Sequence, residues 1–307
     1  MAKRDLLSVA DLSPEEIRQV VGRTSLLKGG EKSTALEGKS VAMLFEKPSL
    51  RTRVSFDVGI KQLGGHPVYL GKDEVGLGGR EAISDVAQVL SRYVDAIVAR
   101  VYQHQTLEEL AKHASVPVIN ALSDVEHPCQ ALGDMFTIQE SLGKTDGVSI
   151  AFVGDGNNVA ASLALASASM GAGCTVASPE GYEIPETLLR MAGQRAKTSG
   201  TGVVQVCAPE EAVTGADVVY TDVWVSMGQE DETKERLEIF RGYQVNPSLM
   251  ELAKPGAIFM HPLPAHHGEE VSSGMLEHPA SVVFNQAENR LHAQKAVLEK
   301  ILEGLGE

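Results

Sequence analysis

Polar and cationic side chains gather directly after several short apolar runs, where an α/β protein would place its chemistry. The first group follows the run 41–45 and is the segment Ser49-Leu50-Arg51-Thr52-Arg53. It contains two hydroxyl and two guanidinium groups. Backbone N–H groups at the start of a helix bind anions, and an arginine fork matches phosphate. The alternative is a solvated basic turn with a serine cap. Because the chain has a net charge of -14, this local cluster of cations favours an anion site.

Two further polar positions follow later apolar runs. Arg100 comes directly after the run 96–99, and His127 opens the loop His-Pro-Cys-Gln, which ends at Gln130 and enters a helix. Taken singly, each position is also compatible with a structural role, since a lone histidine is more often hydrogen-bonded than catalytic. Together with the first group they predict a cationic edge on one sheet.

A glycine-rich segment, Gly154-Asp155-Gly156-Asn157-Asn158, follows the apolar run 148–153. It resembles the front of a dinucleotide-binding fingerprint, and Glu180 stands where an acid could bind the ribose. The third glycine position of that fingerprint holds Val159, whose side chain disfavours the close packing of helix on strand. The two adjacent amides favour polar recognition of a small ligand instead.

Two later segments complete the set of polar strand ends. The segment 222–228 begins with Asp222, and the segment 261–270 holds three histidines and two glutamates. This composition raises the alternative of a metal site. The segment lacks the i, i+4 histidine pair of a helical zinc site, and proline and glycine interrupt any helix, so we expect no metal there. The Leu263-Pro264 peptide is a candidate for the cis form.

The segments between these groups predict alternating strands and helices. Ser13-Pro14-Glu15-Glu16 has the form of a capping box, so a helix is expected to begin there. Short apolar runs typical of buried parallel strands then alternate with segments of helical periodicity. The runs cover residues 41–45, 67–70, 96–99, 116–120, 148–153, 174–177, 203–207, 218–220 and 257–260. The pattern predicts an α/β fold with two doubly wound parallel sheets.

A polar, turn-rich segment at 143–147 separates the two series of strands. We therefore expect a first domain over residues 1–141 and a second over residues 142–287. The uncharged stretch 156–179 contains asparagine and proline, which favours a buried helix followed by a strand over a membrane span. The stretch 287–305 predicts one terminal helix with an apolar face.

Composition excludes several classes of protein. The 307 residues are 43% hydrophobic and 22% charged, which is typical of a folded soluble protein and not of a disordered one. The acidic balance argues against nucleic acid or anionic membranes as partners. Three cysteines without a CxxC pair predict neither a disulfide framework nor a zinc ribbon. Residues 1–8 lack the apolar stretch of a secretory signal, so a cytoplasmic location is expected.

Taken together, the segments resemble the aspartate/ornithine carbamoyltransferase family. The motifs that carry the resemblance span nearly the whole chain: Ser49-Leu50-Arg51-Thr52-Arg53, His127-Pro128-Cys129-Gln130, Asp222 through Ser226-Met227-Gly228, and His261-Pro262-Leu263-Pro264. The segment Asp-x-x-x-Ser-Met-Gly, with Gly-Asp-Gly-Asn-Asn, resembles the ornithine branch. The resemblance implies transfer of a carbamoyl group from carbamoyl phosphate to the δ-amine of L-ornithine, giving L-citrulline and phosphate in arginine biosynthesis. It also implies a homotrimer, or an assembly of trimers, in which the terminal helix returns to the first domain.

The resemblance also assigns roles to residues. Those implied for carbamoyl phosphate lie in the domain 1–141 with the terminal helix 288–307: Ser49, Leu50, Arg51, Thr52, Arg100, His127, Gln130 and Arg290. Those implied for ornithine lie in the domain 142–287: Asn158, Asp222, Ser226, Met227, Pro262 and Leu263. Arg100, His127 and Asp222 are implied as catalytic. Attack of an amine on a carbamoyl group, with phosphate leaving, needs positioning and charge stabilisation, so neither cofactor nor metal is expected.

Two positions depart from the ornithine branch. Pro262 stands where that branch usually has cysteine, and His-Pro-Leu-Pro is the sequence that this motif has in the aspartate branch. Gly76 stands where several relatives place a glutamine or histidine that reaches a neighbouring subunit's site. The alternatives are an aspartate carbamoyltransferase, a dehydrogenase that binds its nucleotide at 154–159, and a non-catalytic anion-binding module. The aspartate carbamoyltransferase is disfavoured by Ser226-Met227-Gly228, and the dehydrogenase is disfavoured by Val159. The anion-binding module is disfavoured by the second set of site residues.

Overall fold

The computed structural model describes residues 3–77, 79–226 and 230–303, and within them two compact units are found. The first unit contains the residues up to Phe136 and those from Asn289 onward, and the second contains Thr137–Glu288. Both boundaries fall inside helices, α6 (Pro128–Leu142) and α12 (Val283–Glu303). Among the described residues, no helix combines the length and apolarity needed to cross a membrane.

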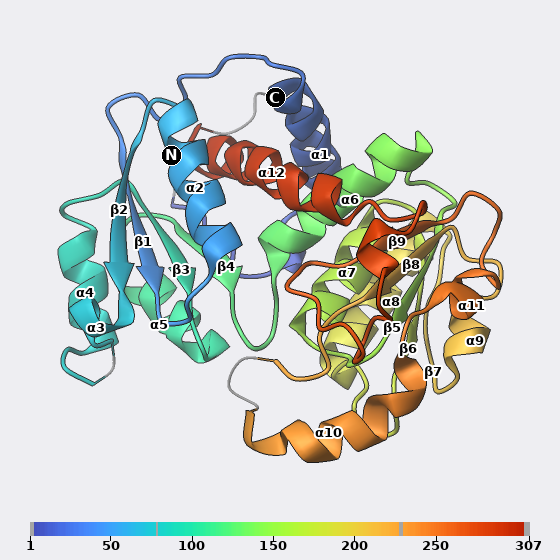
Figure 1. Ribbon diagram of the computed structural model, residues 1–307. Coiled ribbons are helices and arrows are strands. Elements are labelled where there is room, and N and C mark those ends of the chain that lie inside the picture. The colour runs from blue at the N-terminus through green and yellow to red at the C-terminus, as the bar shows by residue number, and fades with distance from the viewer. Residues whose placement is uncertain (1–2, 78, 227–229, 304–307) are drawn as a thin grey trace. The chain divides into compact units, whose positions relative to one another are not determined.

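The first unit is built on a four-stranded parallel sheet in the order β2-β1-β3-β4 (Figure 1). Its strands are β1 (Ser40–Phe45), β2 (His66–Gly71), β3 (Ala96–Arg100) and β4 (Val118–Leu122). Its α-helices are α1 (Pro14–Lys28), α2 (Leu50–Gln62), α3 (Lys72–Val75), α4 (Ile83–Leu90), α5 (His104–His113), the first part of α6 and the part of α12 from Asn289 onward. Every residue of β3 is buried, as expected for a strand covered on both faces.

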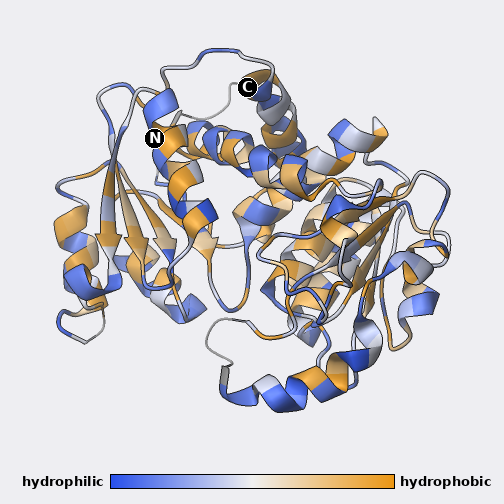
Figure 2. Cartoon of the chain, viewed as in Figure 1, coloured by the Kyte–Doolittle hydropathy of each residue, from blue (hydrophilic) through white to orange (hydrophobic). Residues whose placement is uncertain are grey.

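The second unit has a five-stranded parallel sheet in the order β7-β6-β5-β8-β9. Its strands are β5 (Ser149–Val153), β6 (Gly173–Ala177), β7 (Val203–Val206), β8 (Val218–Thr221) and β9 (Ile258–Met260). Its helices are α7 (Asn158–Ser169), α8 (Glu186–Ser199), α9 (Pro209–Val213), α10 (Thr233–Ile239) and α11 (Pro247–Met250). The stretch 156–179 forms the buried helix α7 and then β6, as predicted. The strands of both sheets are largely apolar (Figure 2).

The predicted fold class is confirmed, and the differences in detail have physical causes. The strand expected over 116–120 begins at Val118, because Pro117 has no N–H to donate to the ladder. The terminal helix begins at Val283, four residues before its predicted start. The short helices α9, α10 and α11 have five, seven and four residues, which is too few for a helical periodicity to predict them.

The terminal part of α12 is anchored within the first unit. The Nη2 group of Arg290 donates to the hydroxyl of Thr52 at 2.7 Å. The Nζ group of Lys28 donates to Asn289 Oδ1, also at 2.7 Å. A Cβ atom at Gly59 of α2 would lie 3.2 Å from Lys295 Cγ, so glycine allows α2 and α12 to pack closely.

Two glutamines of α12 predict opposite effects on stability. Gln294 is fully buried, and neither of its amide atoms has a hydrogen-bond partner in the described part of the chain. Replacing Gln294 by methionine, which has a similar volume, should raise the free energy of unfolding by about 1–2 kcal/mol. Gln286 is equally buried, but its amide accepts from His261 N–H and donates to the Tyr220 hydroxyl. Gln286→Met should therefore destabilise the protein, and urea unfolding of the two variants compares them directly.

Candidate functional site

The first predicted anion site lies where β1 leads into α2. The Ser49 hydroxyl caps α2 by accepting from Thr52 N–H at 3.2 Å, and it donates to Thr52 Oγ1 at 3.0 Å. Phe45, the last residue of β1, pairs in register with Arg100 at the end of β3. Parallel pairing thus brings the α2 N-terminus and the guanidinium of Arg100 to the same edge of the sheet.

Two arginines converge on the buried hydroxyl of Thr52. Arg290 donates to it at 2.7 Å, and the Nη1 group of Arg100 lies 3.5 Å away. Because Arg290 and Ser49 both donate to this oxygen, the Thr52 hydroxyl proton is directed to another acceptor. The hydroxyl and the guanidinium groups therefore form one set of donors.

The electrostatics of this cluster favour a bound anion. Burial, together with the positive charges of Arg290 and Arg51, lowers the pKa of Arg100 to about 9. The Nε atom of Arg100 is buried and has no hydrogen-bond partner among the residues that the structure describes. Guanidinium groups that repel one another in a buried place gain most from a ligand with negative charge.

His127 and Gln130 stand at the start of α6 in the same unit. Burial, with the charges of Arg290 and Arg100, holds the pKa of His127 well below its ordinary value. His127 is therefore a neutral imidazole at pH 7, able to donate one N–H. The Gln130 amide donates to Asp134 at 2.8 Å, and its Oε1 atom is buried without a partner in the described chain. That oxygen can accept a hydrogen bond from a ligand N–H.

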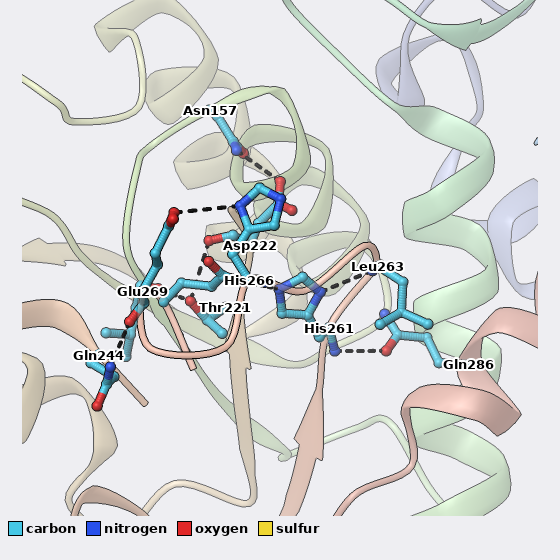
Figure 3. A network of polar contacts seen from close by, with 11 residues as sticks. Asn157, Thr221, Asp222, Gln244, His261, Leu263, His266, Glu269 and Gln286 are labelled. Atoms are coloured by element: carbon cyan, nitrogen blue, oxygen red, sulfur yellow. Dashed lines mark hydrogen bonds and ion pairs between the residues drawn. The ribbon is translucent and has the colours of Figure 1, made fainter. Parts of the chain in front are cut away.

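The second unit places a carboxylate and an amide together at the ends of its central strands. Val153 of β5 pairs with Thr221 of β8, so the residues that follow these strands are neighbours. The Nδ2 group of Asn157 donates to Asp222 Oδ2 at 2.9 Å (Figure 3). Burial raises the pKa of Asp222, and the bond from Asn157 opposes this shift. A buried carboxylate of this kind can pair with an ammonium group.

The glycine motif before α7 has a packing role. A Cβ atom at Gly156 would lie 2.2 Å from Ile184 N, and Gly156 N–H donates to the Tyr182 carbonyl at 2.8 Å. The backbone of residues 182–184 thus occupies the space beside Gly156 that a dinucleotide pyrophosphate would need. This packing argues against the dehydrogenase alternative.

One buried cation of the second unit was missed by the sequence analysis. Arg236 of α10 forms an ion pair with Asp155 and donates to the Trp224 carbonyl at 2.6 Å. It also lies over the rings of Tyr182 and Phe240. Burial raises the pKa of Asp155 to about 6, against the opposing charge of Arg236. Arg236 therefore ties the segment after β8 to the segment after β5.

The segment 261–270 is a hydrogen-bonded turn after β9. The Leu263-Pro264 peptide is cis, and Leu263 has a φ of 58°. His266, Glu269 and Glu270 place ligand-type atoms within 4.8 Å of one another, although exposed groups of this kind are common without an ion. Glu270 Oε1 already accepts from His266 N–H at 2.6 Å.

The structure brings many of the predicted residues together within each unit. In the first unit, hydrogen bonds or charge interactions link Ser49, Arg51, Thr52, Arg100, His127 and Arg290. Leu50, by contrast, is 74% exposed. In the second unit, Asn157 contacts Asp222, while the predicted Asn158 is the first residue of α7. Pro262 is buried, Ser226 and Leu263 are half-buried, and Met227 lies outside the described residues.

Comparison with known proteins adds a family context. Residues 4–140 match the family model of the aspartate/ornithine carbamoyltransferase carbamoyl-P binding domain, and residues 146–301 match its Asp/Orn binding domain. The chain is 54% identical to the ornithine carbamoyltransferase of Pyrococcus abyssi, over 98% of this chain and 96% of that protein. It is 53% identical to the anabolic ornithine carbamoyltransferase of Pyrococcus furiosus, over 99% and 98% of the two chains. The solved structure of ornithine carbamoyltransferase from Pyrococcus furiosus superposes with a TM-score of 0.94 at 52% identity, covering 100% of this chain and 99% of that one.

Proposed function

The chain belongs to the aspartate/ornithine carbamoyltransferase family, and on that premise we propose that it transfers the carbamoyl group of carbamoyl phosphate to the δ-amine of L-ornithine. The products are L-citrulline and phosphate. The observation that carries the proposal is the presence, in one chain, of a buried guanidinium cluster in the first unit and a buried carboxylate in the second. These groups match the charges of carbamoyl phosphate and of an amino acid.

In this proposal the first unit binds carbamoyl phosphate. Ser49, Thr52 and the three guanidinium groups of Arg51, Arg100 and Arg290 hold the phosphate and stabilise the charge that grows on it as it leaves. His127 donates its N–H to the carbonyl oxygen as that oxygen becomes negative. Gln130 Oε1 accepts from the carbamoyl amide, which fixes the orientation of the carbonyl carbon.

The second unit binds ornithine. Asp222, oriented by Asn157, pairs with the α-ammonium group and leaves the δ-amine to react. Asn158, Ser226, Met227, Pro262 and Leu263 complete the ornithine site in this proposal. The neutral δ-nitrogen forms a bond to the carbamoyl carbon, and the C–O bond to phosphate breaks with its electron pair. The proton that the nitrogen loses passes to the departing phosphate.

A substrate comparison tests this function. The purified protein is supplied with carbamoyl phosphate and either L-ornithine or L-aspartate, and the carbamoylated products are quantified. We expect citrulline from ornithine and no carbamoyl-aspartate. Aspartate is the substrate to compare, because the motif His-Pro-Leu-Pro is typical of the aspartate branch. Formation of carbamoyl-aspartate alone would contradict the assignment of ornithine as the substrate.

The pH dependence should reflect the protonation of the nucleophile. The δ-amine resembles a lysine side chain, with a pKa of about 10.4, so only a small fraction is neutral near pH 7. At subsaturating ornithine, the rate should therefore rise about tenfold per pH unit from neutral into the alkaline range. A flat profile of kcat/KM for ornithine between pH 7 and 9 would contradict attack by the free amine.

The proposal extends to assembly and location. We propose that the active form is built on homotrimers and acts in the cytoplasm, as the family resemblance implies. Light scattering coupled to gel filtration tests the assembly, and the expected mass is a multiple of three chains of 32.7 kDa each.

A further inference from the structure

A buried histidine and glutamate lie beside the predicted ornithine residues of the second unit. His261 follows β9 directly, and neither its side chain nor that of Glu270 is exposed to solvent. The Nε2 atom of His261 lies 3.1 Å from Glu270 Oε1. The other ring nitrogen, Nδ1, lies 2.9 Å from the backbone nitrogen of Leu263 (Figure 3). Both nitrogens of the ring are therefore engaged.

These contacts define the tautomer of His261. A backbone N–H can only donate, so His261 Nδ1 must be the acceptor of the bond from Leu263 and carries no proton. The ring proton is then on Nε2, which donates to the Glu270 carboxylate. Glu270 Oε1 also accepts from His266 N–H at 2.6 Å, so the acceptor of the ring proton is itself held in place.

The backbone of His261 is fixed from another direction. Its N–H donates to Gln286 Oε1 at 2.9 Å, and the Gln286 amide donates to the Tyr220 hydroxyl at 3.0 Å. Tyr220 lies in β8 and Gln286 lies in α12, so a strand and a helix both support the histidine. His261 is therefore held in place, and its ring can position the turn that follows it.

The bond to Leu263 N–H controls the orientation of a carbonyl group. The N–H of Leu263 and the carbonyl of Pro262 belong to one trans peptide group and point in opposite directions. Because His261 Nδ1 holds the N–H, the Pro262 carbonyl must point away from the ring. The same bond helps to hold Leu263 at a φ of 58°, which non-glycine residues rarely adopt.

We propose that His261 and Glu270 are positioning residues for ornithine, because their hydrogen-bonded pair aims the Pro262 carbonyl and fixes the Leu263 backbone that the amino acid contacts. This inference rests on the proposed function, which places Pro262 and Leu263 in the ornithine site. Proline has no side-chain acceptor, so its carbonyl is the group that it can offer to an attacking amine. The pair acts through the peptide and does not touch the reacting atoms.

Two substitutions of His261 separate its two contacts. In His261→Asn the side-chain oxygen can take the place of Nδ1 and still accept from Leu263 N–H. In His261→Gln the amide reaches the place of Nε2, which keeps a donor to Glu270 and loses the acceptor for Leu263. We expect KM for ornithine to rise about 10- to 100-fold in His261→Gln and only a few-fold in His261→Asn. KM for carbamoyl phosphate should stay within about twofold in both.

Matched variants at the neighbouring glutamates test the other contact. Glu270→Leu removes the acceptor and should raise KM for ornithine, whereas Glu270→Gln keeps an acceptor oxygen and should restore most of the affinity. Glu269→Gln is the control, because the half-buried Glu269 contacts His266 and not His261. Equal changes in KM for both substrates, or equal KM for ornithine in His261→Asn and His261→Gln, would overturn the proposal.

A spectroscopic measurement without substrate keeps the inference separate from the function. Solid-state ¹⁵N NMR of the histidine-labelled protein, with His261 assigned by its loss in the variants, reports the tautomer. We expect the neutral Nε2–H form at pH 7.5, and an Nδ1–H form or an imidazolium would refute the geometry. Failure of the wild-type protein to carbamoylate ornithine would instead refute the proposed function.

Discussion

Replacing Arg100 by methionine is expected to lower carbamoyl transfer by about 10²–10³-fold while making the ligand-free protein more stable. Arg100 is buried, and its pKa is lowered to about 9 by burial and by the charges of Arg290 and Arg51. Because the pKa of Arg100 is lower in the folded protein than in the unfolded chain, the folded protein binds this proton more weakly. The positive charge of Arg100 therefore lowers the free energy of unfolding at neutral pH. In the wild-type protein this cost decreases as the pH rises above 9. Methionine fills much of the same space without the charge.

The measurement combines steady-state kinetics with urea unfolding. Arg92→Met is the matched control, because Arg92 is exposed and precedes the same strand, β3. It should leave both activity and stability near their wild-type values. An Arg100→Met variant with full activity would place the phosphate elsewhere, and one with lower stability would contradict the electrostatic cost.

Asp222→Asn is expected to lower kcat/KM for ornithine by about 10²-fold or more, with KM for carbamoyl phosphate unchanged. The amide has the same shape as the carboxylate and can still accept from Asn157, but it cannot form an ion pair with the α-ammonium group. Because burial raises the pKa of Asp222, wild-type kcat/KM should fall when the pH is lowered through this raised pKa. The variant should lack that acidic limb.

Asp217→Asn provides the control for this prediction. Asp217 precedes the same strand, β8, and pairs with Lys254 at 2.8 Å. Its replacement should cost some stability and leave KM for ornithine unchanged. If both variants lost ornithine affinity equally, the effect would come from damage to the strand and not from a lost ion pair.

The sequence predicted the strands well because buried parallel strands need apolar residues on both faces. Runs such as 41–45 and 96–99 are too short for a helix and too apolar for a loop, so they predict strands. Parallel topology then implied that the polar residues after these strands meet at one edge. This rule predicts that Thr52 and Arg100 belong to one candidate site, and in the structure Arg100 Nη1 lies 3.5 Å from the Thr52 hydroxyl.

The residues that sequence reasoning missed depend on partners far along the chain. Arg236 lies in a highly charged segment that is typical of a solvated surface, and only its contacts with Asp155 and Tyr182 explain its burial. Asn157 and Asn158 are adjacent amides, and no periodicity decides which of them faces Asp222. A helix cap settles the choice: Asn157 Oδ1 accepts from the first turn of α7, while its Nδ2 group donates to Asp222.

The return of α12 to the first unit has a consequence for the order in which the chain folds during synthesis. The second unit is one continuous stretch, and all of it has been made before the last helix is complete. The first unit needs contacts across 238 residues, between Thr52 and Arg290, and across 276 residues, between Arg23 and Glu299. Domains usually fold from the N-terminus onward on the ribosome. Here the unit that is synthesised first closes last, and the face of α2 around Gly59 stays uncovered until α12 has been synthesised.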